Sequence, residues 1–230
     1  LPHCTVAIPL MSSFRCFHTA SLVVALGSAL HAATYEVAQQ NPQASDDSPG
    51  TAERPWKTIG KATEKAGPGD VIVIRGGMYR ERVLVKRHGT AQAPVRFEAA
   101  PGEHVVLTGA DRLTNWKKAD DSRPVYRVPW PHKFIGWNLN MTHPNDEYHR
   151  LVGRCEQVFV DGYPLRQVLS ASQLAPETFF ADVTSQMLFV WDTGSRDVNK
   201  IHVEASVRQE VLRVEGDYIQ VRGLRFRYAA

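Results

Sequence analysis

Four side chains near the middle of the chain are of types that bind metal ions, namely His143, Asp146, Glu147 and His149. Imidazole and carboxylate groups together suit zinc or a similar divalent ion. The stretch also contains proline and asparagine, so a solvated loop explains the same residues. A third interpretation is hydrogen bonding of Asp146, His149 and Arg150 to a sugar. We predict no metal site here, and we retain His149 and Arg150 as candidate substrate-binding residues.

Aromatic side chains before and within this stretch offer flat faces to sugar rings. They are Trp116, Trp130, Trp137 and Tyr148. An aromatic face packs well against the apolar side of a pyranose and keeps its polar edge free. The alternative is that these rings form a small core of their own. Trp137 and Tyr148 are retained as candidate substrate-binding residues.

Two arginines near the end of the chain, Arg225 and Arg227, are spaced to lie on one face of a strand. A guanidinium group pairs bidentately with a carboxylate, so both are candidate contacts for a uronate sugar. Four more basic residues flank an earlier apolar run, and a solvated outer face explains them equally well: Arg80, Arg82, Lys86 and Arg87.

The overall charge is small and scattered. The 230 residues carry a formal net charge of +3, from 27 basic and 24 acidic side chains, with no basic run. This distribution argues against nucleic acid as a partner and leaves weak attraction to an acidic polymer.

Residues 1–33 have the pattern of upstream residues followed by a secretory signal. Arg15 follows Met11, residues 20–30 form an apolar run too short for a membrane span, and small residues Ala32 and Ala33 come next. We expect a secreted or periplasmic protein of bacterial type, with no membrane span. Cys155 is the only cysteine after this segment, so an intrachain disulfide is not expected.

The elements that would position these groups begin with a strand at Thr34–Val37 and a short helix. Pro55 suits a first helical position, and Trp56, Ile59 and Ala62 follow with helical spacing to form one apolar stripe. A Gly-Pro-Gly-Asp turn at residues 67–70 ends the helix.

Short apolar runs then recur with turns between them, beginning at residues 71, 83, 95 and 105. Two or three such strands make a coil of a size typical of solenoids. One strand cannot bury its apolar face alone, whereas stacked coils can. Residues 34–110 are therefore predicted to be a cap and the first coils of a parallel β-solenoid.

From residue 111 to about 200 this rhythm stops, and we predict an ordered insertion with hairpins near Asp161-Gly162 and at residues 178–191. The rhythm returns in residues 201–230, with runs at 201–203, 211–214, 218–221 and 224–226. No closing amphipathic element follows these runs, so we expect the stack to be truncated and its later coils to be missing.

Several motifs together resemble the N-terminal part of the right-handed parallel β-helix proteins of the pectate-lyase-like superfamily. The matching stretches are Pro49-Gly50-Thr51, Pro55-Trp56-Lys57-Thr58-Ile59, Ala66-Gly67-Pro68-Gly69-Asp70-Val71, Arg75-Gly76-Gly77-Met78-Tyr79-Arg80, Ala100-Pro101-Gly102-Glu103, Gln157-Val158-Phe159-Val160-Asp161-Gly162 and Val221-Arg222-Gly223-Leu224-Arg225-Phe226. The resemblance implies an all-β fold with an N-terminal capping helix. It also implies catalytic residues on middle coils, beyond residue 230, so no catalytic residue is assigned here.

The resemblance implies a secreted carbohydrate-active protein that acts on a polysaccharide, as a glycoside hydrolase or a polysaccharide lyase. A lyase would neutralise a uronate carboxylate with calcium or arginine, whereas a hydrolase would use paired carboxylates. No cofactor is evident, and calcium enters only in the lyase case. A non-catalytic β-helix surface or carbohydrate-binding protein is the alternative, and a metal-dependent hydrolase built on residues 143–149 is the third.

Overall fold

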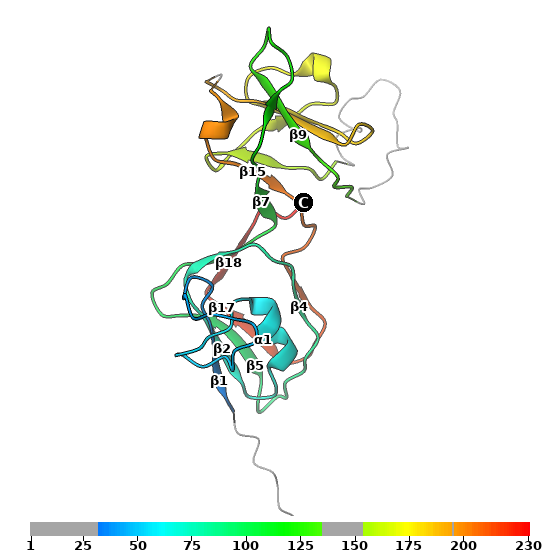
Figure 1. Cartoon of the computed structure of the whole chain (residues 1–230). Coiled ribbons are helices and arrows are strands. Elements are labelled where there is room, and N and C mark those ends of the chain that lie inside the picture. Colours follow the sequence, from blue (N-terminus) through cyan, green and yellow to red (C-terminus); the bar gives the residue numbers. More distant parts are fainter. Residues whose placement is uncertain (1–31, 135–153, 195) are drawn as a thin grey trace, which may run out of the picture.

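The computed structural model describes residues 32–134, 154–194 and 196–230. Figure 1 shows two lobes, a lower one that holds α1 with β1–β6 and β16–β18, and an upper one built mostly from the residues between them. Strands dominate both lobes, which confirms the predicted all-β class. No helix in the described residues is long and apolar enough to cross a membrane. Most of the predicted signal segment lies outside those residues.

A parallel sheet forms one wall of the lower lobe. Its order is β1 (Thr34–Val37), β2 (Val71–Ile74), β5 (Val95–Ala99) and β17 (Ile219–Arg222). In this register Phe97 lies opposite Ile72 on one side and Val221 on the other. Alternate residues of each strand therefore build apolar ladders that run across the sheet into the core.

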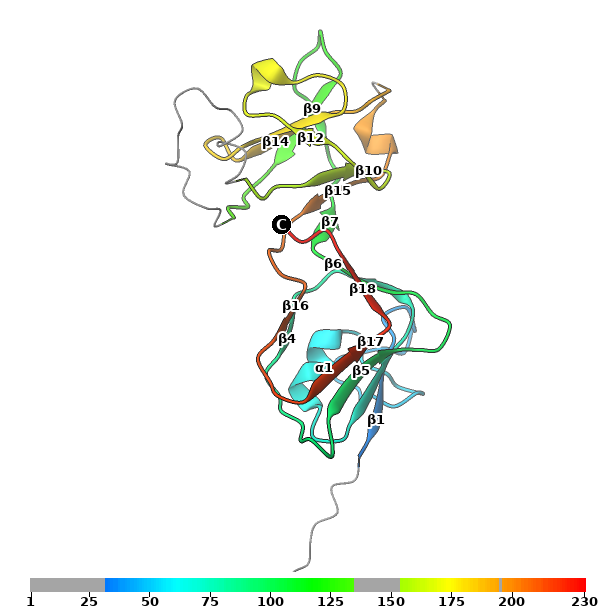
Figure 2. The same cartoon turned by 180° about the vertical axis from the view of Figure 1, so that it is seen from behind.

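Two further walls repeat this pattern. One joins β3 (Gly77–Tyr79), β6 (Val105–Thr108) and β18 (Leu224–Arg227), all parallel. The other pairs β4 (Val83–Val85) with β16 (Leu212–Val214). Figure 2 shows β16, β17 and β18 lying along β4, β5 and β6. The final residues of the chain therefore pack directly on segments more than one hundred residues earlier.

Helix α1 (Ile59–Lys65) packs against the core of the lower lobe, where Ile59 and Ala62 are buried. Thr58 is its N-cap, because the Thr58 hydroxyl accepts a hydrogen bond from the backbone N–H of Lys61 at 3.1 Å. The prediction that the helix begins at Pro55 is therefore wrong. Residue 56 instead bridges to β1 at Val37, which draws the chain away from helical geometry before the cap.

The upper lobe contains two antiparallel sheets around a second core. One has the order β12 (Arg166–Gln167), β13 (Thr178–Asp182), β14 (Met187–Trp191), β9 (Val125–Pro129) and β8 (Lys117–Lys118), with β12 and β13 parallel. The predicted hairpin of residues 178–191 is present as β13 and β14. Trp116 and Trp130 are 5% and 1% exposed within this core, so these two rings are structural.

The second sheet of the upper lobe has the order β11 (Tyr163–Pro164), β10 (Val158–Val160), β15 (Val203–Ser206) and β7 (Ala110–Arg112). Two short 3-10 helices, η1 (Ala171–Gln173) and η2 (Val198–Lys200), complete the lobe. We expected the solenoid to resume at residues 201–203, but β15 pairs antiparallel with β10 and β7. Val203 and Ala205 are buried in the upper core, so parallel stacking on the strands of the lower lobe resumes only at β16.

Candidate binding cleft between the lobes

A hollow of about 470 Å³ lies where the two lobes meet. Arg82 and Arg213 line it from the coils, residues 132–134 line it after β9, and residues 207–210 line it between β15 and β16. Its volume falls within the roughly 300 to 1,000 Å³ typical of ligand pockets. We call this hollow the cleft.

Cations outnumber carboxylates among the side chains that line the cleft. Four basic residues face it together with a single acid, Glu210: Arg82, Lys133, Arg208 and Arg213. Asp111 and Glu215, outside the lining, pair with Arg208 and Arg213 at 2.8 Å and 2.9 Å. Counting these two acids as well, four cations meet three carboxylates and the local charge is +1.

Glu210 organises two of these cations. Its Oε2 accepts from Nε and Nη2 of Arg82 at 3.1 Å and 2.7 Å, and its Oε1 accepts from Nη1 of Arg213 at 3.4 Å. The hydrogen bonds from Arg82 hold the pKa of the Glu210 carboxyl below its ordinary value. Both guanidinium groups are about half exposed, with 52% and 50% of their side-chain surface open. They therefore keep N–H groups available to a ligand in the cleft.

His132 contributes a neutral ring to the wall of the cleft. Its ring meets Trp130 edge-on at 4.7 Å between centroids and lies parallel to Phe134 at 6.3 Å. Burial lowers the pKa of His132 below its ordinary value, so the imidazole is uncharged at neutral pH. His132 therefore offers one donor and one acceptor to a ligand and adds no charge.

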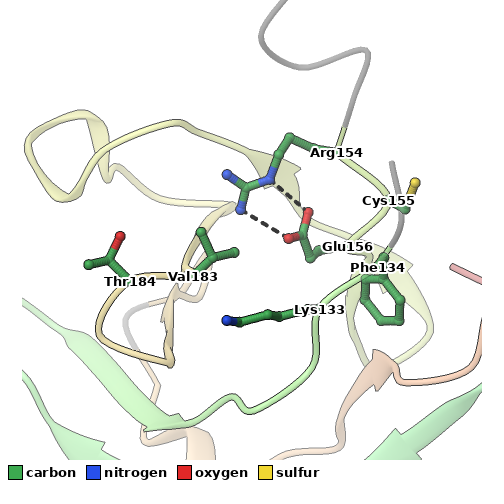
Figure 3. A pocket seen from close by; sticks show the side chains of 7 residues that line it. All are labelled: Lys133, Phe134, Arg154, Cys155, Glu156, Val183 and Thr184. Atoms are coloured by element: carbon green, nitrogen blue, oxygen red, sulfur yellow. Dashed lines mark hydrogen bonds and ion pairs between the residues drawn. The ribbon is translucent and has the colours of Figure 1, made fainter. Parts of the chain in front are cut away.

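A second hollow, of about 460 Å³, adjoins the cleft through Lys133 and Phe134. Figure 3 shows Lys133 extending across this hollow below a paired Arg154 and Glu156, with its amine toward the turn that carries Thr184. Nε and Nη2 of Arg154 each donate to Glu156 at 3.0 Å. Gln167 also donates to Glu156 at 3.0 Å.

The Arg154–Glu156 pair is structural. Its side chains are only 13% and 5% exposed, and Nη2 of Arg154 also donates to the carbonyl oxygen of Ala181 at 2.7 Å. The Glu156 carboxylate is thus held by donors from Arg154 and Gln167 in a buried position, which is the arrangement of a structural ion pair. Cys155 lies beside the pair as a free cysteine and is only partly buried.

The predicted arginines lie elsewhere. Arg225 is exposed on β18, and Nη2 of Arg227 contacts the sulfur of Met78 at 3.5 Å. The guanidinium carbon of Arg227 also lies 4.6 Å from the centroid of the Tyr228 ring. Neither arginine lines the two hollows. The other candidates lie outside the described residues: Trp137, Tyr148, His149 and Arg150, together with His143, Asp146 and Glu147 of the possible metal cluster.

Of the four basic residues around β4, only Arg82 lines the cleft. Arg80 pairs with the buried carboxylate of Glu204 at the junction of the lobes, and Arg87 donates to the carbonyl oxygen of Glu64. Within the described residues, no group of three or more His, Cys, Asp or Glu side chains is arranged to hold a metal ion.

Lys133, Arg208 and Arg213 were not among the sequence-based candidates. The cleft brings together three segments more than forty residues apart along the chain, so no local spacing marks them. The sequence feature that pointed toward the cleft was the cluster of basic residues within 80–87, because it includes Arg82.

No family model matches the chain. Two curated proteins share parts of it. The uncharacterized protein YwoF of Bacillus subtilis is 41% identical over 88 residues, which make up 38% of this chain and 18% of that protein. Pectate lyase PEL9 of Emericella nidulans is 36% identical over 73 residues, 31% of this chain and 18% of that protein. The chain thus spans less than a fifth of the length of either relative.

Solved structures match over most of the chain. A structure of XylC in complex with xylose has a TM-score of 0.70 at 24% identity, and the match covers 85% of this chain and 35% of that one. A glycoside hydrolase has a TM-score of 0.61 at 14% identity over 86% of this chain and 51% of that one. These likenesses concern the fold. Together with the pectate lyase relative, they support a pectate-lyase-like β-helix fold for this chain.

Proposed function

We propose that the chain is part of a secreted carbohydrate-active protein that acts on a polysaccharide, as a glycoside hydrolase or a polysaccharide lyase. The likeness to XylC and to a glycoside hydrolase, and the local relationship to a pectate lyase, support this class. The observation that carries the proposal is the basic cleft between the lobes, because it supplies a site for a polar chain.

Within this proposal the three parallel walls are the faces of a right-handed β-helix, and each successive coil contributes strands to these walls. The in-register stacking of β1, β2, β5 and β17 supports this, as does the matching stacking of β3, β6 and β18. Helix α1 then acts as the N-terminal cap, and residues 111–206 form a lobe inserted between two coils. The insertion forms one side of the cleft, so the fold itself creates the site.

The cleft suits an acidic sugar chain. Guanidinium groups bind carboxylates through paired hydrogen bonds, and exposed Lys133, which lines both the cleft and the adjoining hollow, adds a further positive charge. Neutral His132 gives a hydrogen-bonding group for sugar hydroxyls without competing for the carboxylates. Arg82 and Arg213 are held in place by Glu210, so little side-chain entropy is lost when they bind.

We assign no catalytic residue within the chain and place catalysis on coils beyond residue 230 of a longer protein. Three buried carboxylates of the described residues are each engaged by an arginine: Glu156 by Arg154, Asp192 by Arg196 and Glu204 by Arg80. These ion pairs hold the fold together, and the hydrogen bonds from Arg196 also lower the pKa of the Asp192 carboxyl below its ordinary value. If the reaction is an elimination, calcium or arginine would neutralise the uronate carboxylate during proton abstraction.

A non-catalytic carbohydrate-binding or surface protein is the second candidate. The state of Glu210 favours it, because Glu210 is the one acid among the described residues that line the cleft and the hydrogen bonds from Arg82 lower its pKa, which makes it a poor proton donor. The two candidates share the cleft and differ in whether the polymer is cut.

An activity screen of the full-length secreted protein separates these possibilities. Neutral and acidic polysaccharides are supplied, and unsaturated-uronate absorbance and new reducing ends are read together. A rise in both signals means a lyase, and reducing ends alone mean a hydrolase. Binding without either signal supports the non-catalytic candidate, whereas neither binding nor cleavage across the panel contradicts the proposal.

A further inference from the structure

A third hollow, of about 460 Å³, lies on the upper lobe and shares no lining residue with the cleft. It is built around the hairpin of β10 and β11. Figure 2 labels β10 in the upper lobe. Three apolar residues line it, Val160, Pro164 and Leu165. Four charged residues line it as well: Asp161, Glu177, Asp192 and Arg196. Tyr163 and Thr193 complete it.

Tyr163 is an aromatic ring held out into solvent at this hollow. It is 77% exposed, although its backbone pairs with Val160 in the hairpin. The turn before it is tight, since Asp161 and Gly162 have φ of 50° and 85°. A large exposed ring on a rigid turn is a ready platform for one face of a sugar ring.

Arg196 is fixed in place beside this platform. Its Nε and Nη2 donate to Asp192 at 2.9 Å each, and its Nη1 donates to Asp161 at 2.9 Å. These bonds use three of the five guanidinium N–H groups. Asp192 is 1% exposed, so the guanidinium is anchored from below while 46% of its own side chain stays open. The remaining N–H groups are therefore preorganised donors for a ligand.

An acceptor group lies on the same hollow. Glu177 is exposed and accepts a hydrogen bond from the Thr193 hydroxyl at 3.2 Å. Sugar hydroxyl groups both donate and accept, so they match a site with Glu177 as acceptor and Arg196 as donor. Aromatic platform, acceptor and donor thus line one hollow of suitable size.

The charge of this hollow selects among sugars. Three carboxylates face one guanidinium, which leaves a net charge of −2, the opposite sign to the cleft. An acidic sugar is therefore repelled. A metal cation is also disfavoured, because Arg196 already occupies Asp161 and Asp192. A neutral sugar chain is the ligand that fits both the polar groups and the charge.

We propose that this hollow is a second carbohydrate site, which binds a neutral glycan with a sugar ring stacked on Tyr163 and its hydroxyls on Glu177, Thr193 and Arg196. The proposed function enters only in the choice of carbohydrate as the ligand class. The site uses no residue of the cleft, so it can hold a neutral part of a polymer independently of the cleft.

Isothermal titration with xylohexaose, cellohexaose and hexagalacturonate tests this. At least one neutral hexasaccharide binds the wild-type protein, and Tyr163→Ala weakens that binding by about tenfold, as expected for loss of a central aromatic contact. Tyr163→Phe keeps the ring and binds like the wild type. Tyr218→Ala is the matched control, because Tyr218 is also exposed, at 57%, but lies outside this hollow.

A second variant guards against an effect of Tyr163 on folding. Glu177→Ala removes an exposed acceptor and also weakens binding of the neutral hexasaccharide, whereas hexagalacturonate binding is unchanged in both variants. The proposal is overturned if neither neutral hexasaccharide binds, or if Tyr163→Ala binds it as tightly as Tyr218→Ala does. Hexagalacturonate binding reports on the cleft. Loss of hexagalacturonate binding would therefore contradict the proposed function of the cleft and would leave the test of the neutral-sugar site unaffected.

Discussion

The ring of Phe159 in the upper lobe stacks on the ring of Tyr228 at the end of the coils, with centroids 3.6 Å apart and planes 20° from parallel. The Tyr228 hydroxyl donates to the carbonyl oxygen of Gly162 at 3.3 Å, and Arg227 covers its ring. Nearby, the Gln157 side chain donates to the carbonyl oxygen of Ala229 at 2.9 Å. These contacts join the two lobes directly.

Tyr228→Ala should therefore destabilise the protein. The change removes the stack on Phe159 and the cation–π contact, and we expect a loss of about 1 to 3 kcal/mol in the free energy of unfolding. Urea denaturation measures it, with Tyr218→Ala as the control for an exposed tyrosine. Equal unfolding free energies in the two variants would show that the stack contributes nothing to joining the lobes.

Gly109→Ala should also destabilise the same junction. A Cβ at this position would lie 2.5 Å from the Tyr228 carbonyl oxygen and 3.0 Å from that of Arg208, and backbone atoms cannot move aside cheaply. Overpacking of this kind costs about 1 to 3 kcal/mol. Gly67→Ala is the control, because its added Cβ would meet only the Asp70 carboxylate at 3.6 Å. A thermal midpoint for Gly109→Ala no lower than that control would refute the close approach.

Acidification should weaken the fold partly through His132. Burial lowers the pKa of the folded-state imidazole below the unfolded value of about 6.5, so the unfolded chain binds the proton more tightly. The neutral His132 ring favours the folded state, and this contribution to stability is complete above the unfolded pKa. It is lost as the pH falls from the unfolded pKa toward the lower folded-state pKa. His132→Gln should lose less unfolding free energy than the wild type between about pH 7.5 and about pH 5.5. Identical losses would remove His132 from this pH dependence, and His104→Gln serves as an exposed control.

The strand positions could be predicted largely because alternation of apolar residues is a local signal. Val71–Ile74 and Val83–Val85 occur as expected, since Ile72, Ile74, Val83 and Val85 point into one core. β3 was missed because Gly77–Tyr79 has a glycine and only one buried residue. The predicted run at residues 201–203 overlaps β15 only at Val203, and an apolar run does not tell a strand which sheet to join.

The cleft could not be predicted from the sequence for a related reason. Arg82 and Glu210 lie 128 residues apart and meet only because β16 stacks on β4. Similarly, Arg80 was interpreted as one of a group of surface cations, whereas it pairs with buried Glu204 across the junction. Residue types indicated sugar chemistry, but the partners that distinguish a binding cation from a structural one come from long-range packing.

Titration of hexagalacturonate into the wild-type protein and Lys133→Ala tests the central claim most directly. The account predicts binding that weakens with added salt, as expected for exposed charges, and a several-fold weaker affinity for Lys133→Ala. Lys86→Ala, an exposed lysine outside the cleft lining, should bind like the wild type. Absence of binding at low salt, or equal affinities for Lys133→Ala and Lys86→Ala, would contradict a polysaccharide site between the lobes.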